Sequence, residues 1–158
     1  TTLFRSAGEA DVIHCKSCDY AANMEIGKPG IIKQEPEDFK PMEEVATPAA
    51  KTIDAVAEAL NLPLDKTIKA VVFNVDGKVV LAMVRGDHEV NEIAVQHAVD
   101  GTLEPEMASE EDLKRTGLVA GFISPVGLSQ SDYLAIVVDQ SIMEAYNLCG
   151  GANKVDAH

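Results

Sequence analysis

The spacing of hydrophobic residues changes near residue 47. Residues 1–46 are mostly polar, and glycines and prolines interrupt every run in which a regular period could develop. From Thr47 onward, apolar residues recur at intervals typical of helices and strands. We therefore divide the chain into an irregular arm or linker, residues 1–46, and a single domain, residues 47–158.

Three helices are predicted, each at a point where a residue that can cap the first turn is followed by apolar residues at helical spacing. One follows Thr52, with Ile53 and Val56 on its apolar face. A second follows Asn91. A third follows Ser109, which has an acidic residue three positions later in the pattern of a capping box.

Strands are predicted where β-branched and other apolar residues form continuous runs. Residues 68–84 contain two such runs joined by Asp76-Gly77, a dipeptide that tolerates the positive φ angles of a tight hairpin turn. Both runs are apolar at nearly every residue, so the hairpin is expected to be covered on both faces. Two more buried strands and a short helix are expected at residues 118–127, 133–139 and 140–146. The predicted fold class is α/β, with a mixed, largely antiparallel central sheet flanked by helices.

Composition narrows the classes of function. The 158 residues include 26 acidic and 13 basic side chains, and the formal net charge of -13 argues against an unaided nucleic-acid-binding protein because it repels phosphate backbones. No apolar run approaches the roughly 18 residues that span a bilayer. Three cysteines do not fit a secreted disulfide framework. We therefore expect a cytoplasmic protein with no membrane partner.

The tripeptide Arg85-Gly86-Asp87 has three interpretations. As an adhesion motif it would need an extracellular receptor, which a cytoplasmic composition does not supply. His88 and Glu92, four residues apart, could share a helix face as metal ligands, but two ligands leave a metal site incomplete. The third interpretation is a turn in which Gly86 leads the chain out of a strand and Asp87 helps to cap the next helix.

Cys15 and Cys18 form one C-x-x-C motif. A structural zinc site normally needs a second pair of ligands, and Cys149 alone does not provide one. A redox motif would follow a strand and open a helix, whereas this motif falls in the segment predicted to be irregular. We therefore interpret the motif as a structural remnant.

Four further features are candidates for chemistry, and each has an ordinary structural explanation. Lys69 begins a strand, where it could hold a phosphate or be a solvated charge. Gly121 and Pro125 form a G-x-x-x-P segment, which permits close backbone approach to a ligand but also occurs in ordinary loops. Asp139 ends a buried strand, where it could reach a ligand or cap the following helix. His158 carries no weight by itself.

Taken together, these segments resemble a known family. The blocks CKSCDYAANMEIG, TPAAKTIDAVAEALNLPLDKTIKAVVF, VRGDHEVNEI, GFISPVG and CGGANKVDAH occur in the order found in the insertion domain of bacterial-type prolyl-tRNA synthetase. The resemblance covers nearly all of the chain and implies a single editing-type domain related to freestanding Cys-tRNA(Pro) deacylases. It also favours the turn interpretation of the tripeptide.

The resemblance implies that this domain hydrolyses the ester of alanine attached to the proline tRNA. Alanine is smaller than proline, so a synthetic site cannot exclude it by bulk, and each missing methylene gives only about 1–3 kcal/mol of discrimination. A second, smaller pocket can admit alanine and exclude proline. Ile53 and Val56 match the family positions that shape this substrate pocket, and ordinary core packing would be compatible with the same placement.

The family's catalytic residues carry over to five positions of this sequence. Lys69 matches an essential lysine expected to hold the terminal adenosine through its phosphate. Gly121 and Pro125 match a loop that positions the aminoacyl ester and could offer backbone N–H groups to the developing oxyanion. Asp139 matches an acidic residue aimed at the substrate's α-ammonium or ribose, and His158 matches a histidine that helps to define the pocket.

No Ser-His-Asp or Cys-His nucleophile emerges from the sequence. We therefore expect direct attack by water, assisted by the terminal 2′-hydroxyl of the tRNA, rather than a protein nucleophile. The resemblance implies no metal or other cofactor for this domain, whereas the parent synthetase would use ATP and Mg²⁺ to attach proline.

Nothing in the chain resembles an ATP site or an anticodon-binding domain, so we expect a piece of the parent enzyme that cannot charge tRNA. Its expected partners are the acceptor end of tRNA(Pro) carrying alanine and the other domains of the synthetase, which would supply most of the affinity for tRNA. The parent synthetase is expected to be a homodimer. Two alternatives stay open: a freestanding-type Cys-tRNA(Pro) deacylase, and a non-catalytic module that binds a nucleotide or a protein.

Overall fold

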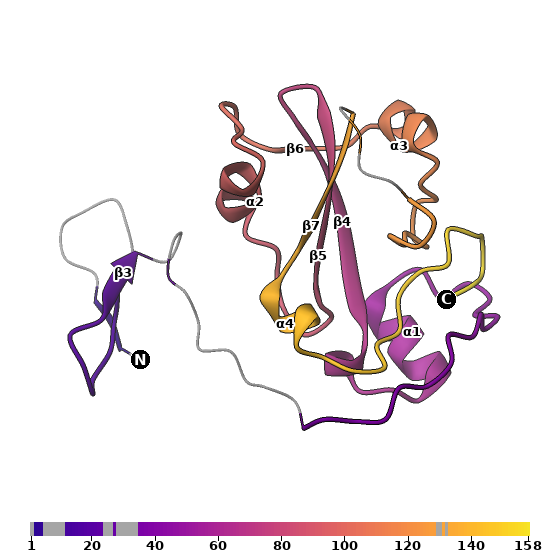
Figure 1. The fold of residues 1–158 in the computed structure, drawn as a ribbon, viewed down its shortest axis with the longest axis horizontal. Helices are drawn as coiled ribbons and strands as arrows, with labels where there is room; N and C mark the ends of the chain where they lie inside the picture. The colour runs from indigo at the N-terminus through magenta and orange to yellow at the C-terminus, as the bar shows by residue number, and fades with distance from the viewer. Residues whose placement is uncertain (1, 5–11, 24–26, 28–34, 129–130, 132) are drawn as a thin grey trace. The chain divides into compact units, whose positions relative to one another are not determined.

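The chain forms two compact units, Thr1–Ile31 and Ile32–His158 (Figure 1). Within the part of the chain that the structure describes, no helix is long and apolar enough to cross a membrane. The structure is a computed structural model that describes residues 2–4, 12–23, 27, 35–128, 131 and 133–158.

The first unit contains a small antiparallel sheet in the order β1 (Thr2–Phe4), β2 (Val12–His14) and β3 (Ala21–Asn23). The prediction that this arm is irregular was wrong for these residues. Each strand has only three residues, which is too short for an alternating pattern to stand out in the sequence. The rest of the predicted arm before residue 35, apart from residues 15–20 and 27, lies outside the described residues.

The second unit is built on a four-stranded sheet in the order β6-β4-β5-β7. The central strands β4 (Ile68–Val75) and β5 (Lys78–Arg85) form an antiparallel hairpin. β6 (Glu106–Met107) pairs antiparallel with β4, and β7 (Leu134–Val138) pairs parallel with β5. This mixed, largely antiparallel sheet confirms the predicted fold class.

The hairpin turn forms at the predicted dipeptide. Asp76 and Gly77 have φ angles of 53° and 82°, the positive values that a tight hairpin turn requires. The side-chain oxygen of Asn74 accepts a hydrogen bond from the Gly77 N–H at 3.0 Å. The Asp76 carboxylate accepts a hydrogen bond from the Thr102 N–H at 2.7 Å, and this contact holds a distant loop against the turn.

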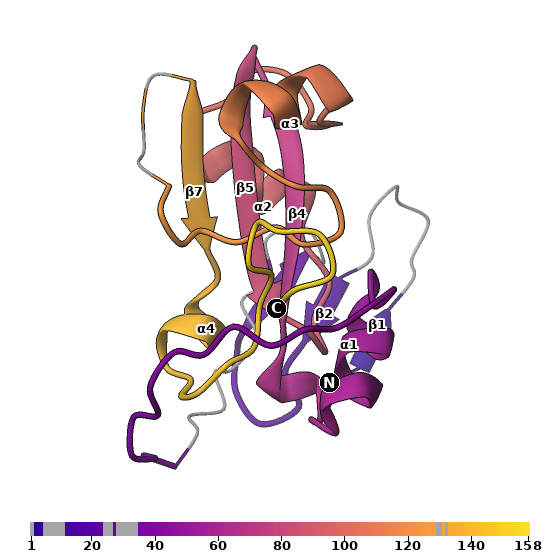
Figure 2. The same cartoon turned by 90° about the vertical axis from the view of Figure 1, so that its right-hand side faces the viewer.

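The hairpin is buried on both faces, as its continuous apolar runs predicted. Leu81 belongs to a cluster on the face that α3 (Glu110–Thr116) covers, whereas Phe73 packs with Val95 of α2 (Glu92–Ala98) on the other face. Figure 2 shows α3 in front of the strands and α2 behind them. Because period-two alternation sends successive side chains to opposite faces, the same two strands supply both layers of the core.

The predicted helix caps are confirmed. Thr52 accepts a hydrogen bond from a backbone N–H in the first turn of α1 (Ile53–Leu60), and Asn91 does the same for α2. The short 3₁₀ helix η1 (Leu64–Lys66), which the sequence did not predict, leads from α1 into β4. α4 (Gln140–Met143) begins after Asp139 and is shorter than the predicted helix.

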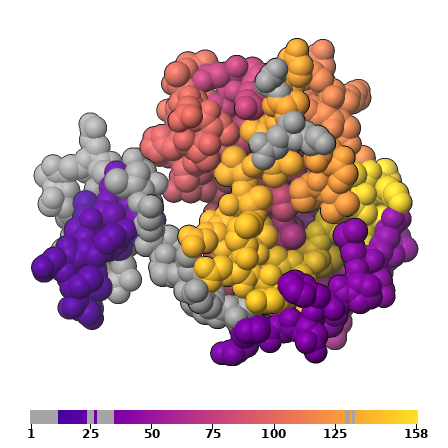
Figure 3. Space-filling view, in the orientation of Figure 1, coloured from indigo at the N-terminus to yellow at the C-terminus, as the bar shows by residue number. Residues whose placement is uncertain are grey.

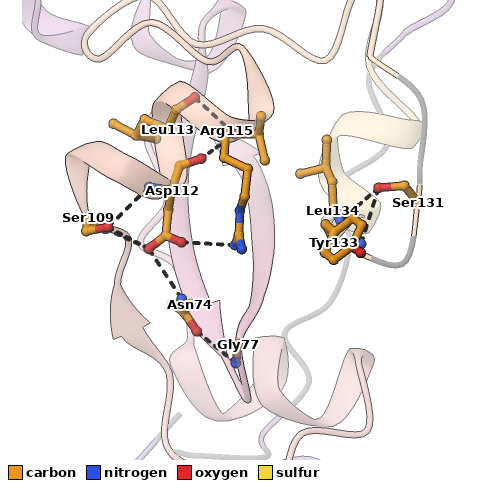
Figure 4. Close-up of polar contacts among 10 residues, drawn as sticks. Asn74, Gly77, Ser109, Asp112, Leu113, Arg115, Ser131, Tyr133 and Leu134 are labelled. Carbon is orange, nitrogen blue, oxygen red and sulfur yellow. Dashed lines mark hydrogen bonds and ion pairs between the residues drawn. The ribbon is translucent and has the colours of Figure 1, made fainter.

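The third cap also ties α3 to the sheet. The Ser109 hydroxyl and the Asp112 N–H share a hydrogen bond, while the Asp112 carboxylate accepts from the Ser109 N–H, which completes a capping box (Figure 4). The Asn74 side chain of β4 donates to the same carboxylate at 3.3 Å. Arg115 donates to Asp112 at 3.0 Å and lies over the ring of Tyr133, 5.9 Å from its centroid.

One predicted strand is absent. Residues 118–127 form turns, in which the Phe122 N–H donates to the Val119 carbonyl at 2.9 Å. Gly121 has a φ of 82°, which is incompatible with a strand, and Pro125 has no N–H to donate to a neighbouring strand. The apolar content of this segment is explained by burial of Phe122 rather than by strand pairing.

Residues 35–46, called the strap below, run along the C-terminal residues of the same unit, as the purple and yellow segments of Figure 3 show. The backbones of Val45 and His158 exchange two hydrogen bonds, of 2.7 and 3.0 Å. The Asn147 side chain accepts from the Lys40 N–H at 2.9 Å. These contacts hold the two ends of the unit together at the edge of a cavity.

Candidate functional site

The second unit contains a cavity of about 220 Å³. Its walls come from four segments that are far apart in the sequence: the start of α1, the start of β4, the turn at residues 121–123 and the C-terminal residues. The lining residues are Lys51, Thr52, Ile53, Val56, Thr67, Ile68, Lys69, Ala70, Gly121, Ile123, Cys149, Gly150, Gly151 and His158.

Most of the predicted site residues meet at this cavity. The predicted residues that line it are Ile53, Val56, Lys69, Gly121 and His158, whereas Pro125 and Asp139 are not among the lining residues. Sequence reasoning missed the other lining residues as parts of a site. Lys51 was detectable in principle, because it precedes the Thr52 cap and lies within the block that carries the family resemblance.

Two lysines contribute positive charge to the cavity wall. Lys69 donates a hydrogen bond from Nζ to Oε1 of Glu89 at 2.7 Å, and the side chain of Glu89 is 89% exposed. Lys51 makes no ion pair within the described residues, and its aliphatic stem lies against Gly121. An exposed ion pair contributes little and exchanges readily, so both ammonium groups are available to an anionic ligand.

Glycines let the backbone close around the cavity. A Cβ atom on Gly151 would lie 2.2 Å from the carbonyl carbon of Phe122, so only glycine fits there. The backbone N–H groups of Gly121, Ile123, Gly150 and Gly151 have no hydrogen-bond partner among the residues described. The wall can therefore offer several N–H donors to a negatively charged oxygen.

His158 is held from three sides. Its Nδ1 lies 2.6 Å from the hydroxyl oxygen of Thr47, and its ring centroid lies 5.3 Å from that of Phe122 in a tilted arrangement. Its backbone pairs with Val45 in the strap. Burial lowers the pKa of the His158 imidazole below its usual range, so the ring is neutral at pH 7.

The two predicted residues outside the cavity lining have local roles. The Asp139 carboxylate accepts a hydrogen bond from the Ser141 N–H at 2.9 Å, and this interaction caps α4. The Pro125 carbonyl accepts from the Leu128 N–H at 3.1 Å in the turn that follows the cavity wall. The geometry of Asp139 therefore matches the helix-cap interpretation.

Arg85-Gly86-Asp87 is an internally paired turn. The Arg85 guanidinium donates two hydrogen bonds, of 2.6 and 2.8 Å, to the Asp87 carboxylate, which lowers the pKa of that carboxyl. Asp87 therefore does not cap α2, and that part of the prediction was wrong. Gly86 is required because a Cβ atom there would lie 1.9 Å from the Thr67 hydroxyl oxygen.

The proposed helix face for a metal is not present, because His88 precedes α2 and Glu92 is its first residue. His88 instead lies near the Arg85 guanidinium, with Nε2 3.3 Å from Nη2. No group of three or more His, Cys, Asp or Glu side chains that could hold a metal occurs within the described ranges.

The C-x-x-C motif lies in the turn between β2 and β3. The Ser17 N–H donates to the Cys15 sulfur at 3.4 Å, and hydrogen bonds from Ser17 and Cys18 lower the pKa of the Cys15 thiol. Cys15 and Cys18 are free thiols, and the motif opens no helix. Cys149 lines the cavity in the second unit, where burial raises the pKa of its thiol.

Comparison with known proteins identifies the family. Residues 47–158 match the family model of the aminoacyl-tRNA editing domain. The chain belongs to this family. The editing domain is an aminoacyl-tRNA deacylase in class, and its relatives are prolyl-tRNA synthetases.

Two curated relatives illustrate the match. A proline–tRNA ligase of Sulfurihydrogenibium sp. is 39% identical over 153 residues, and one of Dehalococcoides mccartyi is 41% identical over 159 residues. The alignments cover 96% and 99% of this chain but only 26% and 27% of these relatives. The chain therefore spans about a quarter of the length of the curated relatives that it matches.

A solved structure shares the fold. The crystal structure of a candidate trans-editing enzyme for prolyl tRNA synthetase superposes with a TM-score of 0.61 at 21% identity, covering 73% of this chain and 72% of that chain. At this identity the likeness establishes the fold alone.

Proposed function

We propose that the editing domain hydrolyses the ester bond of Ala-tRNA(Pro), within a parent enzyme that attaches proline to tRNA(Pro) using ATP and Mg²⁺. The parent would act in the cytoplasm as a homodimer, and its other domains would supply most of the affinity for tRNA. The observation that carries the proposal is the cavity, which gathers two apolar side chains, two lysines, a histidine and free backbone N–H groups.

The size of the cavity favours a small aminoacyl group. Its volume of about 220 Å³ is below the roughly 300–1,000 Å³ of pockets that enclose drug-sized ligands. Ile53 and Val56 form one apolar wall, and Val56 is almost fully buried, so that wall cannot retreat without disturbing the core. We infer that alanine fits against this wall and that the larger ring of proline does not.

The two lysines favour a phosphate group at the cavity. The net charge of -13 makes the chain as a whole repel RNA, so binding needs local positive charge. Lys69 and Lys51 supply that charge on the cavity wall. We propose that Lys69 binds the phosphate of the terminal adenosine. The phosphate would take the place of the exposed Glu89 carboxylate beside the Lys69 ammonium.

The backbone of the cavity supports ester hydrolysis by water. Attack on an ester carbonyl develops negative charge on its oxygen, which free N–H groups stabilise. Gly121, Ile123, Gly150 and Gly151 supply such groups. Cys149 is poorly suited as a nucleophile, because burial raises the pKa of its thiol and keeps it protonated. We therefore propose direct attack by water, assisted by the terminal 2′-hydroxyl of the tRNA.

Pro125 and Asp139 are assigned indirect roles in this proposal. Pro125 stiffens the exit of the turn that carries the Gly121 wall. Asp139 is exposed at the carboxyl end of β7, beyond the cavity lining, where it would meet only a part of the tRNA that extends outside the cavity. We propose that no metal or cofactor takes part in this step, and a chelator should leave the rate unchanged.

The experiment that tests the proposal is release of amino acid from Ala-, Pro- and Cys-tRNA(Pro), for this chain and for Lys69→Ala. Release from Ala-tRNA(Pro) that is lost in the variant is the expected result. Cysteine-selective release would move the substrate assignment to that of the freestanding relatives. No release from any ester, with an active parent synthetase in parallel, would contradict hydrolysis by this domain alone.

A further inference from the structure

We propose that Thr47 fixes the proton of His158 on Nε2, so that His158 presents an N–H donor to the ligand in the cavity instead of a basic nitrogen. Thr47 acts here as a positioning residue. The identity of the ligand rests on the proposed function, but the position of the proton does not.

The contact is short, and one of its two partners is fully buried. Thr47 is 1% exposed, and its hydroxyl oxygen lies 2.6 Å from Nδ1 of His158. The Thr47 N–H donates to the Asp156 carbonyl at 2.8 Å, and Val45 pairs with the backbone of His158, so both partners are fixed by the main chain. The hydroxyl and the ring therefore have little freedom to find other partners.

For the neutral ring, two proton arrangements are possible at this contact. If Nδ1 carried the proton, the Thr47 oxygen would accept it, and the hydroxyl proton would be buried without an acceptor among the residues that the structure describes. A buried donor without a partner is costly. If Thr47 donates to Nδ1 instead, both groups are satisfied. The neutral ring must then carry its proton on Nε2.

The Nε2–H is left for a ligand. His158 lines the cavity, and of its two ring nitrogens only Nδ1 has a hydrogen-bond partner within the described residues. The lone pair of the ring is on Nδ1, where Thr47 occupies it. His158 can therefore donate to an oxygen of the aminoacyl ester or of the terminal ribose, and it cannot take a proton from the attacking water in this state.

The proton position is measured by ¹⁵N NMR of the histidine side chains in the whole chain. The resonances of His158 are assigned by their loss in His158→Gln, which separates them from those of His14, His88 and His97. We expect Nδ1 to show the shift of an unprotonated nitrogen and Nε2 that of a protonated one near pH 7. Protonated Nδ1 would overturn the proposal, whatever the activity of the chain.

Two matched variants test the role of the hydroxyl. Thr47→Ser keeps it, whereas Thr47→Val replaces it with a methyl group of the same shape. We expect the Nδ1 resonance to stay in place in the serine variant and to move in the valine variant, with release of alanine about three- to tenfold slower only in the latter. An unchanged Nδ1 resonance in the valine variant, with the backbone spectrum still that of a folded chain, would remove Thr47 as the partner.

A second pair separates donation from base catalysis. Glutamine at position 158 can donate from its amide but cannot take up a proton, whereas alanine can do neither. We expect His158→Gln to release alanine faster than His158→Ala. Equal rates in the two variants would overturn the donor role. If the unmodified chain released no amino acid from any ester, the proposed function would fail, and the NMR measurement would still decide the proton position.

Discussion

The Nζ atom of Lys69, on the wall of the cavity, lies 2.7 Å from Oε1 of Glu89, which follows the Arg85-Gly86-Asp87 turn. The side chain of Lys69 is 24% exposed and that of Glu89 is 89% exposed. The lysine is thus anchored in the sheet while its partner projects into solvent. A phosphate that enters the cavity can displace Glu89 at little cost.

Lys69→Ala should abolish deacylation with little loss of stability. An exposed ion pair stabilises a protein by about 0–1 kcal/mol, so the fold should survive the change. The matched control is Glu89→Ala, which removes the partner and leaves the lysine free. It should retain deacylation. Rates from Ala-tRNA(Pro) and urea midpoints check both expectations, and wild-type release by Lys69→Ala would exclude the lysine from the site.

Lys51→Ala should weaken binding more than it slows the chemical step. Removal of one phosphate contact to a single-stranded end should reduce the slope of log affinity against log salt by about 0.7. Lys78→Ala removes an equal charge at the hairpin turn, away from the cavity lining, and serves as the control. A similar KM increase in both variants would mean that only the overall charge matters.

Ile53→Ala should enlarge the cavity and allow release from Pro-tRNA(Pro). Truncation of a fully buried isoleucine to alanine costs about 2–5 kcal/mol of unfolding free energy. Ile53 is only half-buried, so its loss of stability should fall below that range. Ile53→Val removes a single methylene and should shift selectivity less. Comparison of release rates for alanine and proline checks the prediction. Unchanged selectivity in Ile53→Ala would return this residue to ordinary packing.

The features that the sequence predicted correctly depend on neighbouring residues. Thr52 and Asn91 cap helices through hydrogen bonds that span three positions, and Asp76-Gly77 forms its turn through its own φ angles. The two-faced burial of the hairpin follows from continuous apolar runs. Such features need no knowledge of the rest of the chain.

The features that the sequence missed depend on distant segments. Thr47 contacts a residue 111 positions away, and nothing in its local sequence indicates that partner. Residues 118–127 are as apolar as a strand, but the positive φ of Gly121 and the turn at Phe122 bury the Phe122 ring without strand pairing. Position 151 requires glycine because the backbone of Phe122 lies against it, and this contact forms only in the folded chain.

Gly151→Ala should destabilise the unit and disrupt the cavity. The new Cβ atom would overlap the backbone of Phe122 at 2.2 Å, and overpacking of this kind costs about 1–3 kcal/mol or more. Gly150→Ala is the matched control, because a Cβ atom there would lie 3.5 Å from Ile68 in ordinary contact. Urea unfolding of the two variants is the measurement. Equal midpoints would show that the Phe122 backbone yields without cost.

His158 should make the unit less stable as the pH falls below about 6.5. Burial lowers the pKa of this imidazole in the folded state, whereas the unfolded chain keeps the ordinary value of 6.5. The unfolded state therefore takes up the proton first, and the free energy of unfolding falls as the pH decreases from that value to the folded pKa. Above about pH 6.5 this histidine contributes no pH dependence.

His158→Gln removes this titration and is the variant to compare. The carboxyls of Asp87 and Asp112, whose pKa values are lowered by hydrogen bonds, titrate at more acidic pH and do not enter this window. We expect the wild type to lose more unfolding free energy than His158→Gln between about pH 7.5 and about pH 5.5. Parallel pH profiles of the two proteins in urea unfolding would mean that the pKa of the His158 imidazole is the same in the folded and unfolded states. Solvent would then reach the ring in the folded state.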